Sequence, residues 1–206
     1  MNILKNLLNK LGLKISSSGK NNIVQYPSSV KFKKTKINIW GNNNTVIIDE
    51  NTKFSRTHIK IGFPDCPANN CVIKIGKNNG FSSVFLQLAE NESSINIGDN
   101  CMITFDTEIV CSDTHCIFDE NNNLLNIGKN ITIGSHVRIC KEVKIMKNTA
   151  IPDGCIVGLR SVITKKFTEP NCVIAGNPAK IVKTNVYWDY ERPNQFLAKN
   201  ESLGLL

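Results

Sequence analysis

Residues 125–163 read LNIGKNITIGSHVRICKEVKIMKNTAIPDGCIVGLRSVI, with an aliphatic residue at every sixth position. These residues are Ile127, Ile133, Ile139, Ile145, Ile151, Val157 and Ile163, and a second, mostly small or β-branched residue stands two positions before each. The same phase occurs upstream at Ile97, Ile103 and Ile109. An α-helix would return apolar residues at intervals of about three or four. A period of six predicts a parallel β-helix, a coil of short strands and bends whose inward side chains stack from turn to turn.

The sequence divides into a coil with an extension at each end. Residues 1–20 predict a short amphipathic helix over Met1–Ile15 and a polar linker. The coil then spans residues 21–183, with an irregular repeat up to about Phe63. Residues 184–206 form a C-terminal extension. Because the ends of a parallel coil are exposed strand edges, we expect the two extensions to cap it.

Composition excludes several function classes. The net charge of +8 comes from lysines spread along the chain without interleaved aromatic residues, which argues against nucleic-acid binding. The chain has no apolar run long enough to cross a bilayer, so any membrane contact would be peripheral, through the N-terminal helix. The eight cysteines form no CxxC pair, and no export signal precedes them. We therefore expect free thiols and a reducing cytoplasm, with Cys101 and Cys155 as compact inward residues.

The repeat is interrupted once in its regular half. Between Ile109 and Ile127, the positions expected to be aliphatic hold His115 and Asn121, which predicts a loop insert over about residues 111–124. A histidine in a loop on a rigid scaffold is a candidate general base. In an extended segment Asp113 would project to the same side as His115, so its carboxylate is a candidate to orient the imidazole.

The C-terminal end of the coil carries the more specific motif. The segment SVITKKFTEPNCVIAGNPAKIVK, residues 161–183, resembles the last turn of the hexapeptide-repeat acyltransferases, which are left-handed parallel β-helices. The insert DTHCIFDENNN together with IGSHVRI resembles the bacterial polysaccharide O-acetyltransferases of that family, which act on capsule, polysialic acid and O-antigen. The resemblance covers residues from about Val72 to Lys183.

This resemblance implies a homotrimer that transfers an acetyl group from acetyl-CoA to a sugar or polysaccharide hydroxyl, without a metal. The family's catalytic histidine maps onto His115, which would take the proton from the attacking hydroxyl. The active-site groove would include His136 and Arg138. The coenzyme would run along neighbouring turns of the coil, at Lys141, Leu159, Thr164, Lys165, Lys180 and Lys183.

Two departures from the family pattern concern this groove. Arg138 stands where the family commonly has tryptophan, within His136-Val137-Arg138-Ile139-Cys140. Leu159 and Arg160 stand where the family commonly has two small residues. These departures favour, as one alternative, a catalytically weakened β-helix scaffold. A second alternative is an N-acyltransferase acting on an amino sugar, because the same fold hosts N-acyl transfer. A zinc enzyme of the γ-carbonic anhydrase type is disfavoured, because the three histidines (His58, His115 and His136) include no close pair on one turn.

Overall fold

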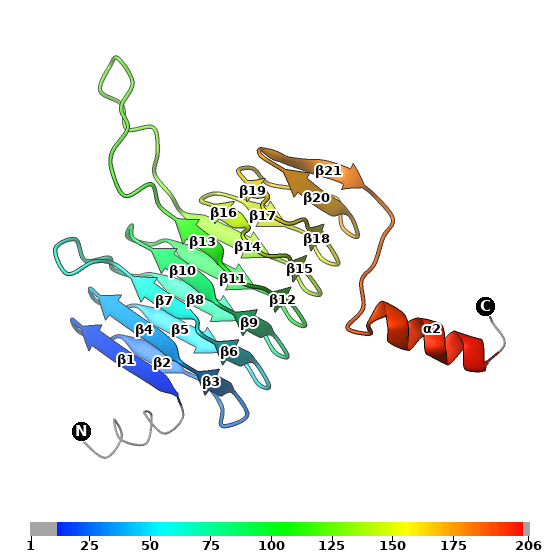
Figure 1. Cartoon of the computed structure of the whole chain (residues 1–206). Coiled ribbons are helices and arrows are strands. Elements are labelled where there is room, and N and C mark those ends of the chain that lie inside the picture. The colour runs from blue at the N-terminus through cyan, green and yellow to red at the C-terminus, as the bar shows by residue number, and fades with distance from the viewer. Residues whose placement is uncertain (1–11, 204–206) are drawn as a thin grey trace.

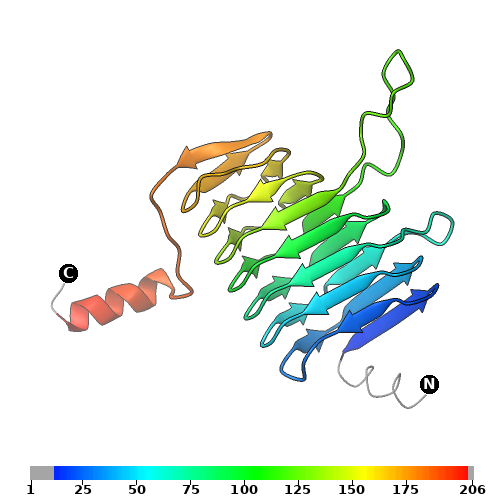
Figure 2. The ribbon, with the colours of Figure 1, turned by 180° about the vertical axis from the view of Figure 1, so that it is seen from behind.

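The computed structural model describes residues 12–203 and consists of three parallel β-sheets wound into a three-walled coil (Figure 1). Each turn except the last contributes one strand to sheet A, one to sheet B and one to sheet C before the next turn begins. We refer to the corners of the coil as the A/B, B/C and C/A edges, after the sheets that each corner joins. The view from behind shows the same stack of turns, with the insert rising from one corner and the C-terminal helix lying beside the coil (Figure 2).

The strands are short, and their bounds follow the repeat. Sheet A contains β1 (Leu13–Ser18), β4 (Thr35–Trp40), β7 (His58–Ile61), β10 (Val84–Leu88), β13 (Thr107–Cys111), β16 (Lys144–Met146) and β19 (Val162–Ile163). Sheet B contains β2 (Ile23–Gln25), β5 (Thr45–Ile48), β8 (Val72–Ile75), β11 (Ser94–Ile97), β14 (Asn130–Ile133) and β17 (Ala150–Ile151). Sheet C contains β3 (Lys31–Lys33), β6 (Lys53–Ser55), β9 (Gly80–Ser82), β12 (Met102–Ile103), β15 (Arg138–Ile139), β18 (Ile156–Val157), β20 (Val173–Gly176) and β21 (Ala179–Lys183).

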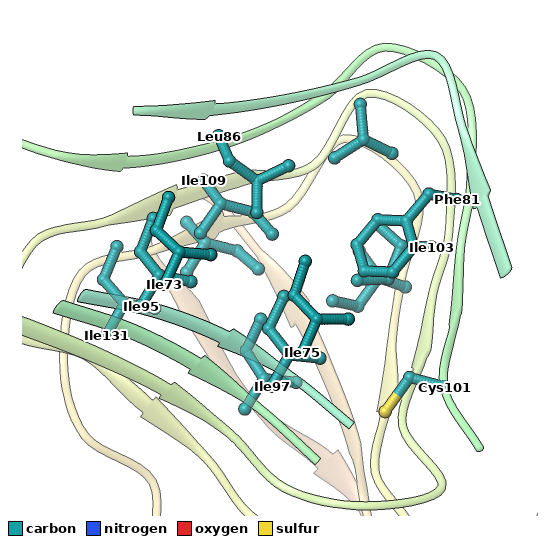
Figure 3. Close-up of a cluster of buried hydrophobic side chains, with 14 of the residues drawn as sticks. Ile73, Ile75, Phe81, Leu86, Ile95, Ile97, Cys101, Ile103, Ile109 and Ile131 are labelled. Atoms are coloured by element: carbon teal, nitrogen blue, oxygen red, sulfur yellow. The ribbon is translucent and has the colours of Figure 1, made fainter. Parts of the chain in front are cut away.

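The core is a set of apolar columns in strict register. On sheet A the paired inward residues are Ile37, Ile59, Leu86, Ile109, Ile145 and Ile163, all fully buried. Figure 3 shows side chains from the three walls, among them Ile73, Leu86 and Phe81, pointing into the same interior. The predicted hexad positions from Ile95 to Ile109 and from Ile131 to Ile163 are all buried. Because side chains alternate across a strand, one inward face per strand suffices to fill the coil.

The coil starts earlier than the sequence predicts. Residues 13–18 form strand β1, which pairs in parallel with β4, where a helix end and linker were expected. Leu13 is fully buried and Ile15 packs against the core, so the alternation in LKISSS belongs to the first turn of the wall. The rest of the predicted helix, residues 1–11, lies outside the described part of the chain.

The two ends of the coil differ. At the C-terminal end β20 turns back into β21, the one antiparallel pair among the described strands. The chain then leaves sheet C, returns along the B/C edge through Trp188 and Tyr190, and ends in α2 (Pro193–Ser202), which has no buried residue. No helix in residues 12–203 is long and apolar enough to cross a bilayer.

The insert is longer than predicted, and its far end has the opposite phase. Strand β14 begins at Asn130, and Leu125 and Ile127 are 62% and 52% exposed instead of being part of the core. The buried residues of this stretch are Asn126 and Gly128. A shift of one residue exchanges the two faces of an extended segment, so the hexad phase read through Leu125 and Ile127 was wrong.

Candidate functional site

The insert connects β13 to β14 at the A/B edge and projects away from the wall (Figure 1). Its outer part is a small hairpin closed by an antiparallel bridge between Phe118 and Leu124. The tip is held by Asp119, whose carboxylate accepts bonds from Asn121 and Asn123. These bonds lower the pKa of Asp119, first through the Asn123 side chain. The residues near the wall form the root of the insert, and they include His115.

His115 has a fixed backbone and an exposed side chain. Its N–H donates to the Asp113 carbonyl (2.7 Å), and its carbonyl accepts from Nδ2 of Asn126 (2.8 Å). The preceding residue, Thr114, has a φ of 69°, and its N–H donates to Oγ of Ser112 (2.8 Å). Positive φ is uncommon for a β-branched residue, and such strained residues cluster at functional sites. The root therefore holds the His115 main chain while leaving the imidazole exposed to an incoming substrate.

In the described part of the chain, the Asp113 carboxylate makes no hydrogen bond to the His115 imidazole. It accepts instead from the ammonium of Lys147 and from Nδ2 of Asn126 (3.0 Å). The Lys147 hydrogen bond, supported by Asn126, holds the pKa of Asp113 below its usual range. The sequence suggested Asp113 as the carboxylate that orients His115, and in the structure its carboxylate contacts Lys147 of the next turn and Asn126.

A carboxylate from the turn below supports the same root. Glu90 accepts from the Ser112 hydroxyl (2.7 Å) and from the Gly128 N–H (2.5 Å), so it joins both ends of the insert. A Cβ at position 128 would lie 2.5 Å from the Cys111 carbonyl oxygen and 2.6 Å from Oε2 of Glu90. Position 128 therefore requires glycine.

A cavity of about 170 Å³ lies beside His115. Its far wall comes from the loop that follows β7, through Phe63 and Cys66, and its near wall comes from the root and the hairpin. The lining residues are Phe63, Cys66, Ala89, Glu90, Ser112, Thr114, His115, Cys116, Leu124, Asn126 and Ile127. Its lining mixes apolar surface with a few polar groups, and its volume lies below the roughly 300–1,000 Å³ of most small-molecule pockets.

The two predicted groove residues lie at another corner of the chain. His136 occupies the B/C edge, where its ring stacks on Trp188 with the ring centroids 4.5 Å apart. Its Nε2 is 2.9 Å from the Trp188 carbonyl, and the Trp188 indole N–H donates to the His136 carbonyl (2.7 Å). Arg138 lies on the outer face of sheet C, with its guanidinium 5.9 Å from the centre of the Trp188 ring. Within one protomer neither residue meets His115.

The predicted coenzyme residues are spread over three places. Lys141 and Leu159 lie on adjacent turns of the C/A edge, where Lys141 approaches the ring of Phe105. Thr164 and Lys165 follow β19 at the A/B edge, on the same edge as the insert. Lys180 and Lys183 belong to β21 on sheet C. Thr164 and Lys165 therefore lie at a different corner of the coil from Lys141 and Leu159.

Five of the eight cysteines are buried: Cys71, Cys101, Cys111, Cys155 and Cys172. Burial raises the pKa of Cys101 to about 11 and that of Cys111 to about 12, so these thiols are protonated at neutral pH. Cys66 and Cys116 are exposed and line the cavity. All eight cysteines are free, as predicted. The described residues contain no group of three or more metal-ligating side chains.

His58 is separate from the insert. It lies on the outer face of sheet A, its Nε2 is 2.8 Å from Oδ1 of Asn38, and its ring packs against Phe85. Burial lowers its pKa, and Lys36 and Lys60 lower it further.

Four residues of the site and its surroundings were missed by the sequence reasoning: Glu90, Asn126, Lys147 and Trp188. Glu90 and Lys147 act through contacts between turns, Asn126 through contacts within the insert, and Trp188 through a contact from the C-terminal extension. Hexad spacing gives no information on contacts of these kinds. One signal was present: Asn126 and Gly128 stand at the end of the insert, where a buried polar residue and a glycine mark a close approach of two backbones.

Comparisons with known proteins find similarity to acetyltransferases. No protein-family model matches the chain. It is 33% identical over 115 residues to the polysialic acid O-acetyltransferase of Escherichia coli O1:K1 / APEC, and 34% identical over 121 residues to that of Neisseria meningitidis. These alignments cover 55% and 58% of this chain but 37% and 56% of the relatives. The chain thus spans about half the length of the curated relatives it matches.

Solved structures extend the similarity over nearly the whole fold. The polysialic acid O-acetyltransferase OatWY is 30% identical and superposes with a TM-score of 0.69, covering 92% of this chain and 98% of that one. The polySia-specific acetyltransferase NeuO has the same fold, with a TM-score of 0.69 at 24% identity over 94% of this chain and 96% of that one. The chain therefore belongs to the hexapeptide-repeat acyltransferases, the family of the polysialic acid O-acetyltransferases.

Proposed function

We propose that the protein is an O-acetyltransferase that moves the acetyl group of acetyl-CoA to a sugar hydroxyl of a bacterial surface polysaccharide or its precursor. The observation that carries this proposal is the His115 imidazole, held at the rim of a cavity by a fixed backbone. Membership of the acyltransferase family supplies the reaction class.

His115 acts as the general base. Its imidazole accepts the proton of the acceptor hydroxyl while the hydroxyl oxygen attacks the thioester carbonyl carbon. The tetrahedral intermediate collapses with cleavage of the carbon–sulfur bond, and the imidazolium returns the proton to the leaving thiolate. Backbone N–H groups of a neighbouring turn would stabilise the oxyanion. No acyl-enzyme forms, and the raised pKa values of Cys101 and Cys111 agree with cysteines that are not nucleophiles.

The acceptor sugar occupies the cavity beside His115. Phe63 and Leu124 provide apolar surface for a sugar face, and the open side of the cavity admits a longer chain. The lysines at the A/B and C/A edges and on β21 fit the phosphates of the coenzyme, because none of Lys141, Lys165, Lys180 and Lys183 forms an ion pair within residues 12–203.

The proposal combines residues of two protomers. His115 lies at the A/B edge, whereas Arg138 and Lys141 lie on sheet C and the C/A edge. We therefore place the coenzyme between His115 of one protomer and sheet C of a neighbour in a trimer of left-handed coils. In a trimer with threefold symmetry this contact occurs three times and the ring of protomers is closed.

Release of free thiol from acetyl-CoA tests the proposal. The parent should release thiol in the presence of an acceptor polysaccharide, and His115→Ala should lose activity by about 10²-fold or more, since general bases contribute about that much. His58→Ala is the matched control and should keep the parent rate. An amino sugar in place of the polysaccharide separates N-acyl from O-acyl transfer. A His115→Ala variant as fast as the parent would contradict the assignment, and an inactive parent with every acceptor would favour the weakened scaffold.

A further inference from the structure

Three polar side chains meet at the root of the insert, and we refer to Asp113, Asn126 and Lys147 as the clasp. Asp113 follows β13, Asn126 lies near the end of the insert, and Lys147 follows β16 on the next turn of the coil. The Asp113 carboxylate accepts from both of the others. The clasp therefore ties the beginning of the insert to its end and to the wall above.

Asn126 is the centre of this arrangement. Its Nδ2 donates to Oδ2 of Asp113 (3.0 Å) and to the His115 carbonyl (2.8 Å), and its Oδ1 accepts from the Ile117 N–H (2.9 Å). The side chain is only 9% exposed. An amide has two donors and one acceptor oxygen, so no other side chain of this size can make all three contacts. Both backbone sides of His115 are thereby fixed, through Asn126 at the carbonyl and Asp113 at the N–H.

Lys147 holds the clasp against the wall. Its side chain and that of Asp113 are both largely shielded from solvent, with 18% and 27% exposure. An ion pair in this setting is screened less than the exposed pairs of this chain, such as Arg160 with Glu142. Glu90 braces the same root from the turn below. The outer hairpin lacks comparable anchors to the wall in the described hydrogen bonds.

We propose that Asn126 and Lys147 are positioning residues for the acetyl transfer, acting through the backbone of His115. This inference rests on the proposed function. Neither side chain needs to touch the transferred acetyl group. They hold the imidazole at the angle and distance that the acceptor hydroxyl requires, and a displacement of about 1 Å at a reacting group can cost about 10²-fold in rate.

The roles of these residues predict a specific kinetic pattern. Losing the clasp should lower kcat, because the base is less often in place. The KM for acetyl-CoA should change less than kcat, because only Thr164 and Lys165 among the predicted coenzyme residues lie on the edge that carries the clasp. Asn126→Ala should lower kcat by about 10- to 100-fold. Lys147→Met should lower it less, and Lys147→Arg, which keeps the cation, should recover most of the parent rate. Asn123→Ala at the hairpin tip is the matched control and should leave both constants unchanged.

Hydrogen exchange gives a readout that does not depend on the reaction. In Asn126→Ala the amides of residues 112–117 should exchange faster than in the parent, while those of β13 and β16 stay protected. An unchanged kcat in Asn126→Ala and Lys147→Met would overturn the proposal. The proposal would also be overturned if Lys147→Arg lowered kcat as much as Lys147→Met. A fall in kcat accompanied by loss of amide protection across the whole coil would overturn it as well. A parent that releases no thiol with any acceptor would refute the proposed function first, and the positioning role with it.

Discussion

Ile145 in β16 and Asn126 in the insert are both buried, but different forces hold them. Ile145 stacks between Ile109 and Ile163 in a column repeated on every turn, so its position depends on volume and apolar contact. Asn126 has no equivalent on any other turn and depends on three hydrogen bonds. We therefore expect the wall to tolerate exchange of one aliphatic residue for another, and the insert to be sensitive to the loss of its polar contacts. This difference explains why the wall produces a periodic pattern in the sequence and the insert does not.

The largest effect is expected in the wall. Ile145→Asp places an unpaired charge inside an apolar column, and we expect a loss of more than about 4 kcal/mol, enough to unfold the coil. Thr132→Asp, at an exposed position of β14, is the matched control and should melt like the parent. Circular dichroism against temperature measures both. A folded Ile145→Asp protein with the parent melting temperature would refute the register of sheet A.

The second-largest effect is expected in the C-terminal extension. Trp188 is 6% exposed and Tyr187, beside it, is 83% exposed. Trp188→Ala should release the segment from His136 and cost about 2–4 kcal/mol locally, near the lower end for large aromatic residues because the site lies at the surface of the coil. Tyr187→Ala should change nothing. Limited proteolysis after residue 183 distinguishes them, and equal cleavage rates for the two variants would show that the stacking does not hold the segment.

Two glycines compare the insert root with the wall directly. Gly128→Ala should destabilise the protein by about 1–3 kcal/mol and lower thiol release, because its Cβ would meet backbone and Glu90. Gly80→Ala on sheet C meets nothing within 4 Å and should be neutral. Urea unfolding provides the free energies. A neutral Gly128→Ala would mean that the root can move away from Glu90.

The smallest effect is a dependence on pH. The pKa of Asp113 is lowered in the folded protein, chiefly by Lys147, so its contribution to stability is fully present above the pKa of the unfolded chain. That contribution is lost as the pH falls through the lowered folded-state pKa. The difference in the free energy of unfolding between the parent and Asp113→Asn should therefore become smaller at acid pH. If the difference in the free energy of unfolding between parent and variant stays constant from neutral pH to about pH 3, a charged Asp113 in the clasp is excluded.

The fold could be predicted from sequence where turns are regular. A turn takes 18 residues near Ser135 and Asp153, which is three hexads, and there the spacing identified every inward residue. It takes 36 residues across the insert, between Ser94 and Asn130. Within the insert the inward positions depart from the hexad pattern, and no residue in the sequence signals the change. The first turn was missed because Leu13 and Ile15 continue the apolar stripe that suggested a helix.

The site could be predicted only as far as its location. The interrupted repeat pointed to His115 as a candidate because an insert in a regular coil is a local feature of the sequence. Its supports were not predictable, since Lys147 lies 34 positions from Asp113 and Trp188 lies 52 positions from His136. Contacts of this kind are decided by which turn lies above which, and that depends on the length of every loop between them.

A structure of the assembled protein with acetyl-CoA bound tests the central claim most directly. The measurement is which side chain lies nearest the thioester sulfur and to which protomer it belongs. We expect the imidazole of His115, with the coenzyme in a cleft between this protomer and sheet C or the C/A edge of its neighbour. A coenzyme seated away from every insert, or a His115 ring remote from all clefts between protomers, would contradict the account.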